Sequence, residues 1–280
     1  MITADFHMHS AHSEDSDSPM EQQIEAAVAA GLKCICFTEH MDKDWPKDDG
    51  IKKGGAPADK ALFELDTETY YKHCMECRDK FRDRIDIRFG VEYGFQPHLT
   101  EHNRAYASKY PFDFIIGSQH LMNGADVYYP ENFAELSDRE AFRAYFENEL
   151  ESICLFDGYD VFGHPDYIVR YGTNKNKDYH YNDHADVIDE ILRQLIKRGK
   201  GIEINTAGFR KLGNEPNPST EILRRYRELG GEIITVGSDA HTPGSVAYDF
   251  DRAEKLLLEL GYTYYCIFKD RKPEFISLLK

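Results

Sequence analysis

The chain has 280 residues, of which 41% are hydrophobic and 30% charged, and its formal net charge is −16. This length suits one large α/β domain, while the negative charge argues against a nucleic-acid backbone as the main partner. No apolar run approaches the length of a membrane span, and residues 1–6 show no signal-peptide pattern, so we expect a cytoplasmic protein with no membrane partner.

Seven strand-like apolar runs alternate with helix-like segments along the chain. The predicted strands cover residues 2–6, 33–37, 85–91, 112–117, 159–162, 201–204 and 232–236. The predicted helices cover residues 19–30, 67–83, 97–108, 137–156, 184–198, 219–229 and 246–260, followed by a weaker strand at 263–268 and one or two helical turns at 272–279. Repeated β-α units predict a single α/β domain over residues 1–280, either a TIM-type barrel, which we favour, or an open doubly wound sheet.

Two long irregular stretches, residues 41–66 and 126–136, interrupt this alternation. Connections of this length are often lids or binding loops, and disorder is the alternative for the middle of the first one. The two stretches contain Trp45, Tyr128 and Tyr129, which could cover a substrate ring or could equally be packing residues.

The six cysteines are expected to be reduced in a cytoplasmic protein. Cys74 and Cys77 form a single C-x-x-C pair inside a predicted helix. Because no second pair accompanies it, we interpret both residues as packing residues rather than as a zinc ribbon or a redox centre.

Histidine and carboxylate side chains recur just after the predicted strands. The candidates are His7, His9, His40, Glu92, His120, His164, Asp239 and His241. In a barrel the strand ends form one rim, so these side chains should meet there. So many ligands without thiolates predict two or three divalent ions, with Zn, Mn or Fe as the candidates. Such clusters activate water and stabilise phosphoryl transfer, which indicates hydrolysis.

The candidate ligands belong to recognisable motifs. In chain order these are His7-x-His9, Thr38-Glu39-His40, Glu92, His120, Gly163-His164-Pro165 and Asp239-Ala240-His241. The set resembles the PHP (polymerase and histidinol phosphatase) superfamily over essentially the whole chain, and the length and motif order are similar to its stand-alone histidinol-phosphatase branch. The resemblance implies a distorted (β/α)7 barrel with a trinuclear metal site that hydrolyses a small phosphomonoester. The leading substrate is L-histidinol phosphate, an intermediate of histidine biosynthesis.

The resemblance also implies which residues bind each ion. One ion takes His7, His9, Glu92 and Asp239, the second takes Glu92, His120 and His164, and the third takes His40, His241 and one more ligand. Family members often read H-x-H-x5-H, which would place a histidine at position 15, where this chain has Asp15. We expect Asp15 to be that ligand because it keeps the spacing, with His12 as its competitor.

Our mechanistic hypothesis is an in-line attack on phosphorus by a hydroxide that bridges the metal ions, with Glu92 as a bridging carboxylate. Asp239 or His241 could pass a proton to the leaving alkoxide. Arg170 and Arg210 are candidate phosphate contacts. Weaker candidates for polar contacts to the substrate are Ser118 and Asn205.

Two alternatives stay open from the sequence. The chain could hydrolyse another small phosphate, such as a nucleotide or sugar phosphate, or it could be a non-catalytic PHP scaffold that binds metal for stability. The nearly complete ligand set and the absence of a polymerase region argue against the scaffold. The oligomeric state is not predictable from the sequence.

Overall fold

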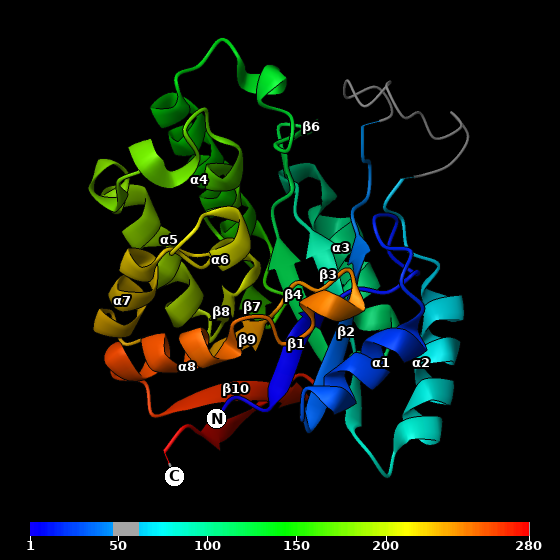
Figure 1. The fold of residues 1–280 in the computed structure, drawn as a ribbon. Coiled ribbons are helices and arrows are strands. Elements are labelled where there is room, and N and C mark those ends of the chain that lie inside the picture. Colours follow the sequence, from blue (N-terminus) through cyan, green and yellow to red (C-terminus); the bar gives the residue numbers. More distant parts are fainter. Residues whose placement is uncertain (47–61, 280) are drawn as a thin grey trace.

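Seven parallel strands form a barrel in the computed structural model, which describes residues 1–46 and 62–279 (Figure 1). The strands are β1 (Ala4–Met8), β2 (Cys34–Met41), β3 (Asp86–Gly94), β4 (Phe114–Ser118), β7 (Val161–Phe162), β8 (Gly201–Asn205) and β9 (Ile234–Gly237). They lie side by side in this order, and a bridge between Met8 and Ala240 brings β9 back to β1. The amide of His9 donates to the Ala240 carbonyl at 2.9 Å across the same seam. The predicted TIM-like barrel is therefore confirmed.

Helices surround the strands. They are α1 (Met20–Ala29), α2 (Thr67–Phe81), α3 (Thr100–Lys109), α4 (Asp138–Leu155), α5 (Ala185–Lys197), α6 (Ala207–Lys211), α7 (Thr220–Glu228) and α8 (Phe250–Glu259). Local sequence explains where α4 begins, because Ser137 and Glu140 form a reciprocal capping box at its first turn. The apolar face of α5 carries Val187, Ile191 and Leu195, all buried, and so packs the helix onto the core. None of the described helices is both long and apolar enough to cross a bilayer.

The prediction for residues 272–279 was wrong. Instead of a helix, β11 (Lys272–Ser277) pairs antiparallel with β10 (Tyr264–Lys269). The two residues between them, Asp270 and Arg271, both have positive φ, at 48° and 64°, which is the geometry of a tight hairpin turn. Two other short elements were not predicted: α6, and a small hairpin of β5 (Leu121–Met122) and β6 (Ala125–Asp126).

The β10–β11 hairpin lies below the amino-terminal ends of the barrel strands (Figure 1). The Phe268 ring of β10 packs 4.9 Å from Phe114 at the start of β4, and Phe114 packs 5.3 Å from Phe6 inside the barrel. This end of the barrel is thus closed by apolar side chains. The carboxyl-terminal ends of the strands, where the predicted ligands lie, form the opposite mouth.

Candidate metal centre

Glu92 lies at the centre of the predicted ligands. Its Oε1 is 2.9 Å from Nε2 of His164 and 3.2 Å from Nε2 of His120. Its Oε2 is 3.1 Å from both Nε2 of His7 and Nδ1 of His40. Nε2 of His9 is 3.5 Å from the same Oε2. Five histidines from four different strands or strand ends therefore surround one carboxylate, as expected when strand ends meet at one rim.

The remaining ligands complete the ring. Oδ1 of Asp239 is 3.8 Å from His7 Nε2, 3.7 Å from His9 Nε2 and 3.6 Å from His241 Nδ1. Four triplets here have ligand atoms within 4.8 Å of one another: His7–His9–Asp239, His7–Glu92–His164, His40–Glu92–His120 and His9–His40–His241. Because the triplets share members, they describe one cluster that could hold two or three ions rather than separate sites.

Several ligand atoms in this cluster are buried and make no hydrogen bond of acceptable geometry, although some of them lie 3.1 Å from a carboxylate oxygen. They are His7 Nε2, His9 Nε2, His40 Nδ1, Glu92 Oε2 and His241 Nε2. Burying a polar atom without a partner costs free energy, so clusters of such atoms call for an explanation. Nitrogen and carboxylate oxygen are the donors that zinc and similar cations take, and the cluster therefore fits divalent metal ions.

The electrostatics differ among the predicted ligands. Nearby carboxylates outweigh burial and raise the pKa of His7, His40 and His120, whereas Glu92 and His9 are shifted in the direction that suits metal binding. Burial alone would raise the pKa of Glu92, but His7, His120 and His40 outweigh it and hold that pKa well below its ordinary value. Burial, together with the neighbouring His241 and His40, lowers the pKa of His9 well below its ordinary value. The carboxylate is therefore charged and the His9 ring neutral, which are the protonation states that bind metal.

Asp15 and His12, the two competitors for the last ligand position, point to different places. Oδ2 of Asp15 is 3.1 Å from His241 Nε2 and 3.5 Å from His40 Nε2. Nε2 of His12 is instead 2.9 Å from Nδ1 of His73 on α2. The geometry favours Asp15, although its role as a ligand stays a prediction.

The sequence reasoning missed three carboxylates that orient the histidines. Asp42 accepts from His120 Nδ1 at 2.7 Å, and Glu203 contacts His7 Nδ1 at 2.8 Å. Glu39 accepts from the Ser13 hydroxyl at 2.6 Å, and that hydroxyl is 3.1 Å from His9 Nδ1. Carboxylates behind metal-binding histidines fix the ring orientation and the tautomer.

A signal for two of these carboxylates was present in the sequence. Glu203 is an acidic residue inside a run that is otherwise apolar and strand-like, and Glu39 follows such a run within the Thr38-Glu39-His40 motif; both are buried. A charge that faces the interior of a barrel needs a partner, so such positions point to the polar end of the barrel. Asp42 gave no comparable signal, because it lies just past its strand at the start of a long loop.

Of the two arginines predicted to bind phosphate, one is buried and one is exposed. The buried Arg170 contacts Asn217 Oδ1 through Nε at 2.6 Å and Asp239 Oδ2 through Nη1 at 3.4 Å. The exposed Arg210 lies over the Tyr248 ring, 4.6 Å from its centroid. Phosphate binding by either arginine stays a prediction.

Two lysines that the sequence reasoning missed join these arginines at one depression. Its basic residues are Arg170, Lys175, Arg210 and Lys211, and it shares Tyr128 and Tyr129 with the mouth of the barrel. The charge of Arg170, with burial and Arg210 adding to it, lowers the pKa of Lys211 to about 8. With Glu131 as an acidic residue in the same lining, the depression carries an excess of positive charge beside the cluster of predicted ligands.

Ser118 and Asn205, the weaker candidates for substrate contacts, are fully buried. The Ser118 hydroxyl donates to Glu92 Oε1 at 2.7 Å. Asn205 contacts Arg170, Glu203 and Asp239. Both residues thus lie beneath the ligands and position them in this structure, and their contact with substrate stays a prediction.

A pocket of about 390 Å³ opens directly over the cluster. Its lining includes the predicted ligands Asp15, His40 and His120 and the aromatic residues Trp45, Phe63, Tyr128, Tyr129 and Tyr167. The aromatic residues of both long loops therefore face the mouth. Residues 47–61, the middle of the first loop, lie outside the described residues, so its predicted role as a lid stays a prediction.

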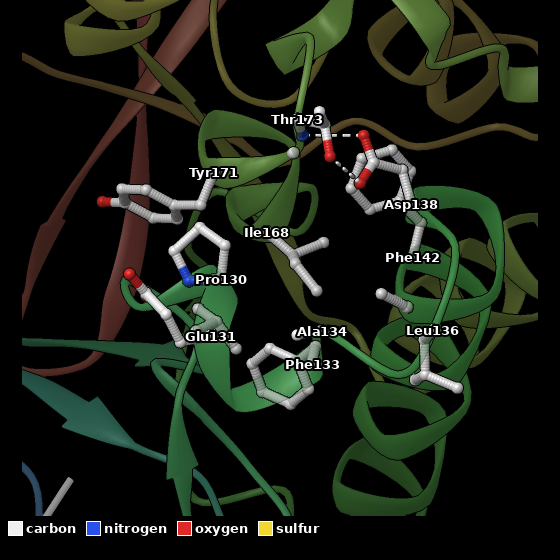
Figure 2. A pocket seen from close by; sticks show the side chains of 13 residues that line it. Pro130, Glu131, Phe133, Ala134, Leu136, Asp138, Phe142, Ile168, Tyr171 and Thr173 are labelled. Atoms are coloured by element: carbon white, nitrogen blue, oxygen red, sulfur yellow. Dashed lines mark hydrogen bonds between the residues drawn. The ribbon is translucent and has the colours of Figure 1, made fainter. Parts of the chain in front are cut away.

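A second pocket, of about 380 Å³, contains none of the predicted ligands (Figure 2). Its lining is mostly apolar and includes Pro130, Phe133, Phe142 and Ile168, while Thr173 is hydrogen-bonded to Asp138 at its edge. Without titratable groups that converge on a common point, this pocket offers no catalytic chemistry. The candidate site is the pocket over the cluster.

Comparisons with known proteins agree with this geometry. The profile of the PHP domain family matches residues 5–207. The chain is 33% identical over 252 residues to a probable histidinol-phosphatase from Clostridium acetobutylicum, covering 90% of this chain and 91% of the relative. It is 31% identical over 278 residues to the histidinol-phosphatase of Lactococcus lactis, covering 97% and 96%.

A solved structure is also similar. The histidinol phosphate phosphatase of Lactococcus lactis, complexed with zinc, L-histidinol and phosphate, matches with a TM-score of 0.87 at 30% identity. The match covers 97% of this chain and 98% of that one.

Proposed function

This chain belongs to the PHP domain family, and we propose that it is a metal-dependent histidinol-phosphatase. It hydrolyses L-histidinol phosphate to L-histidinol and phosphate, a step of histidine biosynthesis. The observation that carries the proposal is the cage of nitrogen and carboxylate donors at the mouth of the barrel. That barrel is similar over nearly its whole length to a histidinol phosphate phosphatase with zinc and both reaction products bound.

The cluster is proposed to hold three divalent ions, zinc first, with manganese or iron as alternatives. Following the family resemblance, the proposed ligands are His7, His9, Glu92 and Asp239 for one ion, Glu92, His120 and His164 for another, and Asp15, His40 and His241 for the last. The geometric triplets use the same residues but group His164 with His7 and Glu92, and His120 with His40 and Glu92. Ions at these positions would acidify water and offset the charge on the phosphoryl oxygens. His40 lies between two carboxylates, because its Nδ1 faces Glu92 and its Nε2 faces Asp15.

The chain's own residues supply binding and orientation. Arg210 and Lys211 at the rim attract the phosphate dianion and orient it by charged hydrogen bonds. Arg170 and Asn205 hold Asp239 through its second oxygen, Oδ2, which leaves Oδ1 facing His7 and His9. These contacts fix Asp239 before substrate binds.

The proton for the leaving alkoxide is proposed to come from Asp239 or His241. Both lie after β9 at the mouth, with Oδ1 of Asp239 3.6 Å from His241 Nδ1. The His241 side chain is 27% exposed and that of Asp239 is 9% exposed, so His241 is the more accessible of the two to a leaving group. General acid catalysis requires such access.

The pocket over the cluster suits the histidinol part of the substrate. The Trp45 and Phe63 rings contact each other with centroids 4.2 Å apart and planes tilted by 33°, and Tyr128 and Tyr167 line the same pocket. Aromatic walls accept a flat imidazole, and the carboxylate of Glu14 in the lining favours an ammonium group. A sugar phosphate carries no flat aromatic ring to stack on these walls.

Phosphate release from a panel of esters tests the proposal. The zinc-loaded chain should hydrolyse L-histidinol phosphate with a kcat/KM at least about a hundredfold above that for a nucleoside monophosphate or a sugar phosphate, as expected for a site that pairs specific polar groups. Preference for another ester would identify a different PHP phosphatase. Absence of turnover of every ester by fully metallated protein would favour the scaffold and overturn the proposal.

A further inference from the structure

A second group of candidate metal ligands lies outside the cluster at the barrel mouth, where α1 and α2 run next to each other (Figure 1). Glu21 belongs to the first turn of α1, and His73 and Cys77 lie four residues apart on α2. Residues four apart share one face of a helix. One ligand atom from each of the three side chains lies within 4.8 Å of the other two.

A neighbouring histidine fixes the orientation of the His73 ring. Nδ1 of His73 is 2.9 Å from Nε2 of His12, and its other nitrogen, Nε2, is 3.5 Å from Oε2 of Glu21. When Nδ1–H of His73 donates to His12, Nε2 keeps its lone pair and presents it toward Glu21. Metal-binding histidines are commonly held in this way by a partner on the opposite ring nitrogen.

The three donors differ in their access to solvent. Cys77 is 1% exposed, whereas the side chains of Glu21 and His73 are 38% and 33% exposed. A cation could thus approach from solvent and meet the thiol at the bottom of the group. Lys80 is the competing cation, with its Nζ 3.6 Å from Oε1 of Glu21, while Oε2 faces His73.

We propose that Glu21, His73 and Cys77 form an auxiliary site for a thiophilic divalent cation, zinc in the first place. Thiolate, imidazole and carboxylate are the common protein ligands of zinc, and water completes the fourth position. The site tethers α1 to α2. Through His12 it also steadies the loop that carries Asp15, the proposed ligand at the barrel mouth.

The protonation of Cys77 sets how binding depends on pH. Burial raises the pKa of the Cys77 thiol to about 11, so the thiol is neutral at pH 7. Binding releases its proton to solvent as the metal–sulfur bond forms, and the affinity therefore rises with pH below that pKa. The described ligands of the barrel site include no thiol, so binding there does not require a thiol to lose its proton.

Cobalt titration of the metal-stripped protein tests the site without relying on activity. A cobalt–thiolate bond gives an intense near-ultraviolet charge-transfer band, which the nitrogen and oxygen ligands at the barrel mouth do not give. We expect this band in the unaltered chain, its loss in Cys77→Ser, and its retention in the matched control Cys154→Ser, where the replaced cysteine is exposed.

His73→Gln provides a second variant at a position that tolerates change, since the side chain is partly exposed. We expect the cobalt affinity, followed by the thiolate charge-transfer band, to fall about tenfold or more. Elemental analysis should find one zinc fewer per chain. Absence of the band in the unaltered chain at saturating cobalt would overturn the proposal. So would a band that survives Cys77→Ser or a cobalt affinity unchanged in His73→Gln.

Discussion

Buried charged side chains are paired at one end of the barrel and lack hydrogen-bond partners for several of their atoms at the other. At the amino-terminal end, Asp160 accepts from the Ile115 amide at 2.8 Å and from the Arg271 guanidinium, and Asp113 accepts from the Phe89 amide at 3.0 Å and from Arg78. At the mouth, the predicted ligands lie close together and several of their atoms lack a hydrogen bond. Pairing stabilises the closed end, whereas the mouth keeps donors that a cation would satisfy.

The comparison teaches that the same residue types serve stability or function according to their partners. Asp113 and Asp160 each have an arginine within the chain. Glu92 has five histidines and no arginine among the described contacts, which is a metal-binding environment rather than a structural ion pair. Substitutions at the two ends should therefore change different measured quantities.

The largest expected effect is on turnover, from Glu92→Gln. This change removes the carboxylate charge that faces five histidines at the proposed bridge between ions, so kcat/KM should fall on the order of 10³-fold or more. Phosphate release and metal content per chain measure it, with exposed Glu151→Gln as the control. Near-normal turnover with full metal content would remove Glu92 from the proposed role.

A smaller effect is expected for the carboxylates that hold the ligand histidines in place. Asp42→Asn keeps a hydrogen-bond acceptor for His120 but removes its charge, so zinc affinity or kcat/KM should fall about 10–100-fold. Competition with a chelator measures the affinity. Asp44→Asn, two residues along and 53% exposed at its side chain, is the matched control. Equal effects of the two substitutions would mean that Asp42 acts through the net charge of this region and not through its contact with His120.

At the closed end the expected loss is in stability and not in turnover. Arg271→Met leaves Asp160 without its cation, and because Arg271 is 28% exposed we expect the free energy of unfolding to fall by about 2 kcal/mol, less than for a fully buried pair. Urea denaturation measures it, beside exposed Arg104→Met. A large fall in kcat at unchanged stability would contradict the division between the two ends.

Arg210→Ala tests the basic patch beside the cluster. Loss of one charged hydrogen bond to phosphate should raise KM about tenfold, with a smaller change in kcat. Steady-state kinetics on L-histidinol phosphate measure both constants, and Arg104→Ala is the control. An unchanged KM and kcat would exclude Arg210 as a phosphate contact.

The smallest expected effect is a change in the pH profile. Lys211, with its pKa near 8, is charged below that pH and neutral above it, so its attraction for phosphate is lost as the pH rises through about 8. Replacement by arginine keeps the charge at both pH values. The kcat/KM of Lys211→Arg should therefore exceed that of the unaltered chain a few-fold at pH 9, with a smaller difference at pH 7. Identical pH profiles for the variant and the unaltered chain would show that Lys211 does not affect binding.

The sequence by itself determined the barrel and the ring of proposed ligands. Strands and helices follow from local patterns of apolar residues, and parallel strands in a barrel must end at one rim. Residues as distant in sequence as His7 and Asp239 therefore meet for a topological reason, and the position of each just after a strand is visible in the sequence.

Only the tertiary structure decided which residues stand behind the ligands and which candidate faces the cluster. Asp42 and Glu203 reach His120 and His7 across the barrel, and Asp15 rather than His12 turns toward His241. Lys211 likewise reaches the basic patch through α6, which was not predicted. These contacts depend on loop paths and on distances between residues far apart in the chain, and local sequence patterns do not encode them.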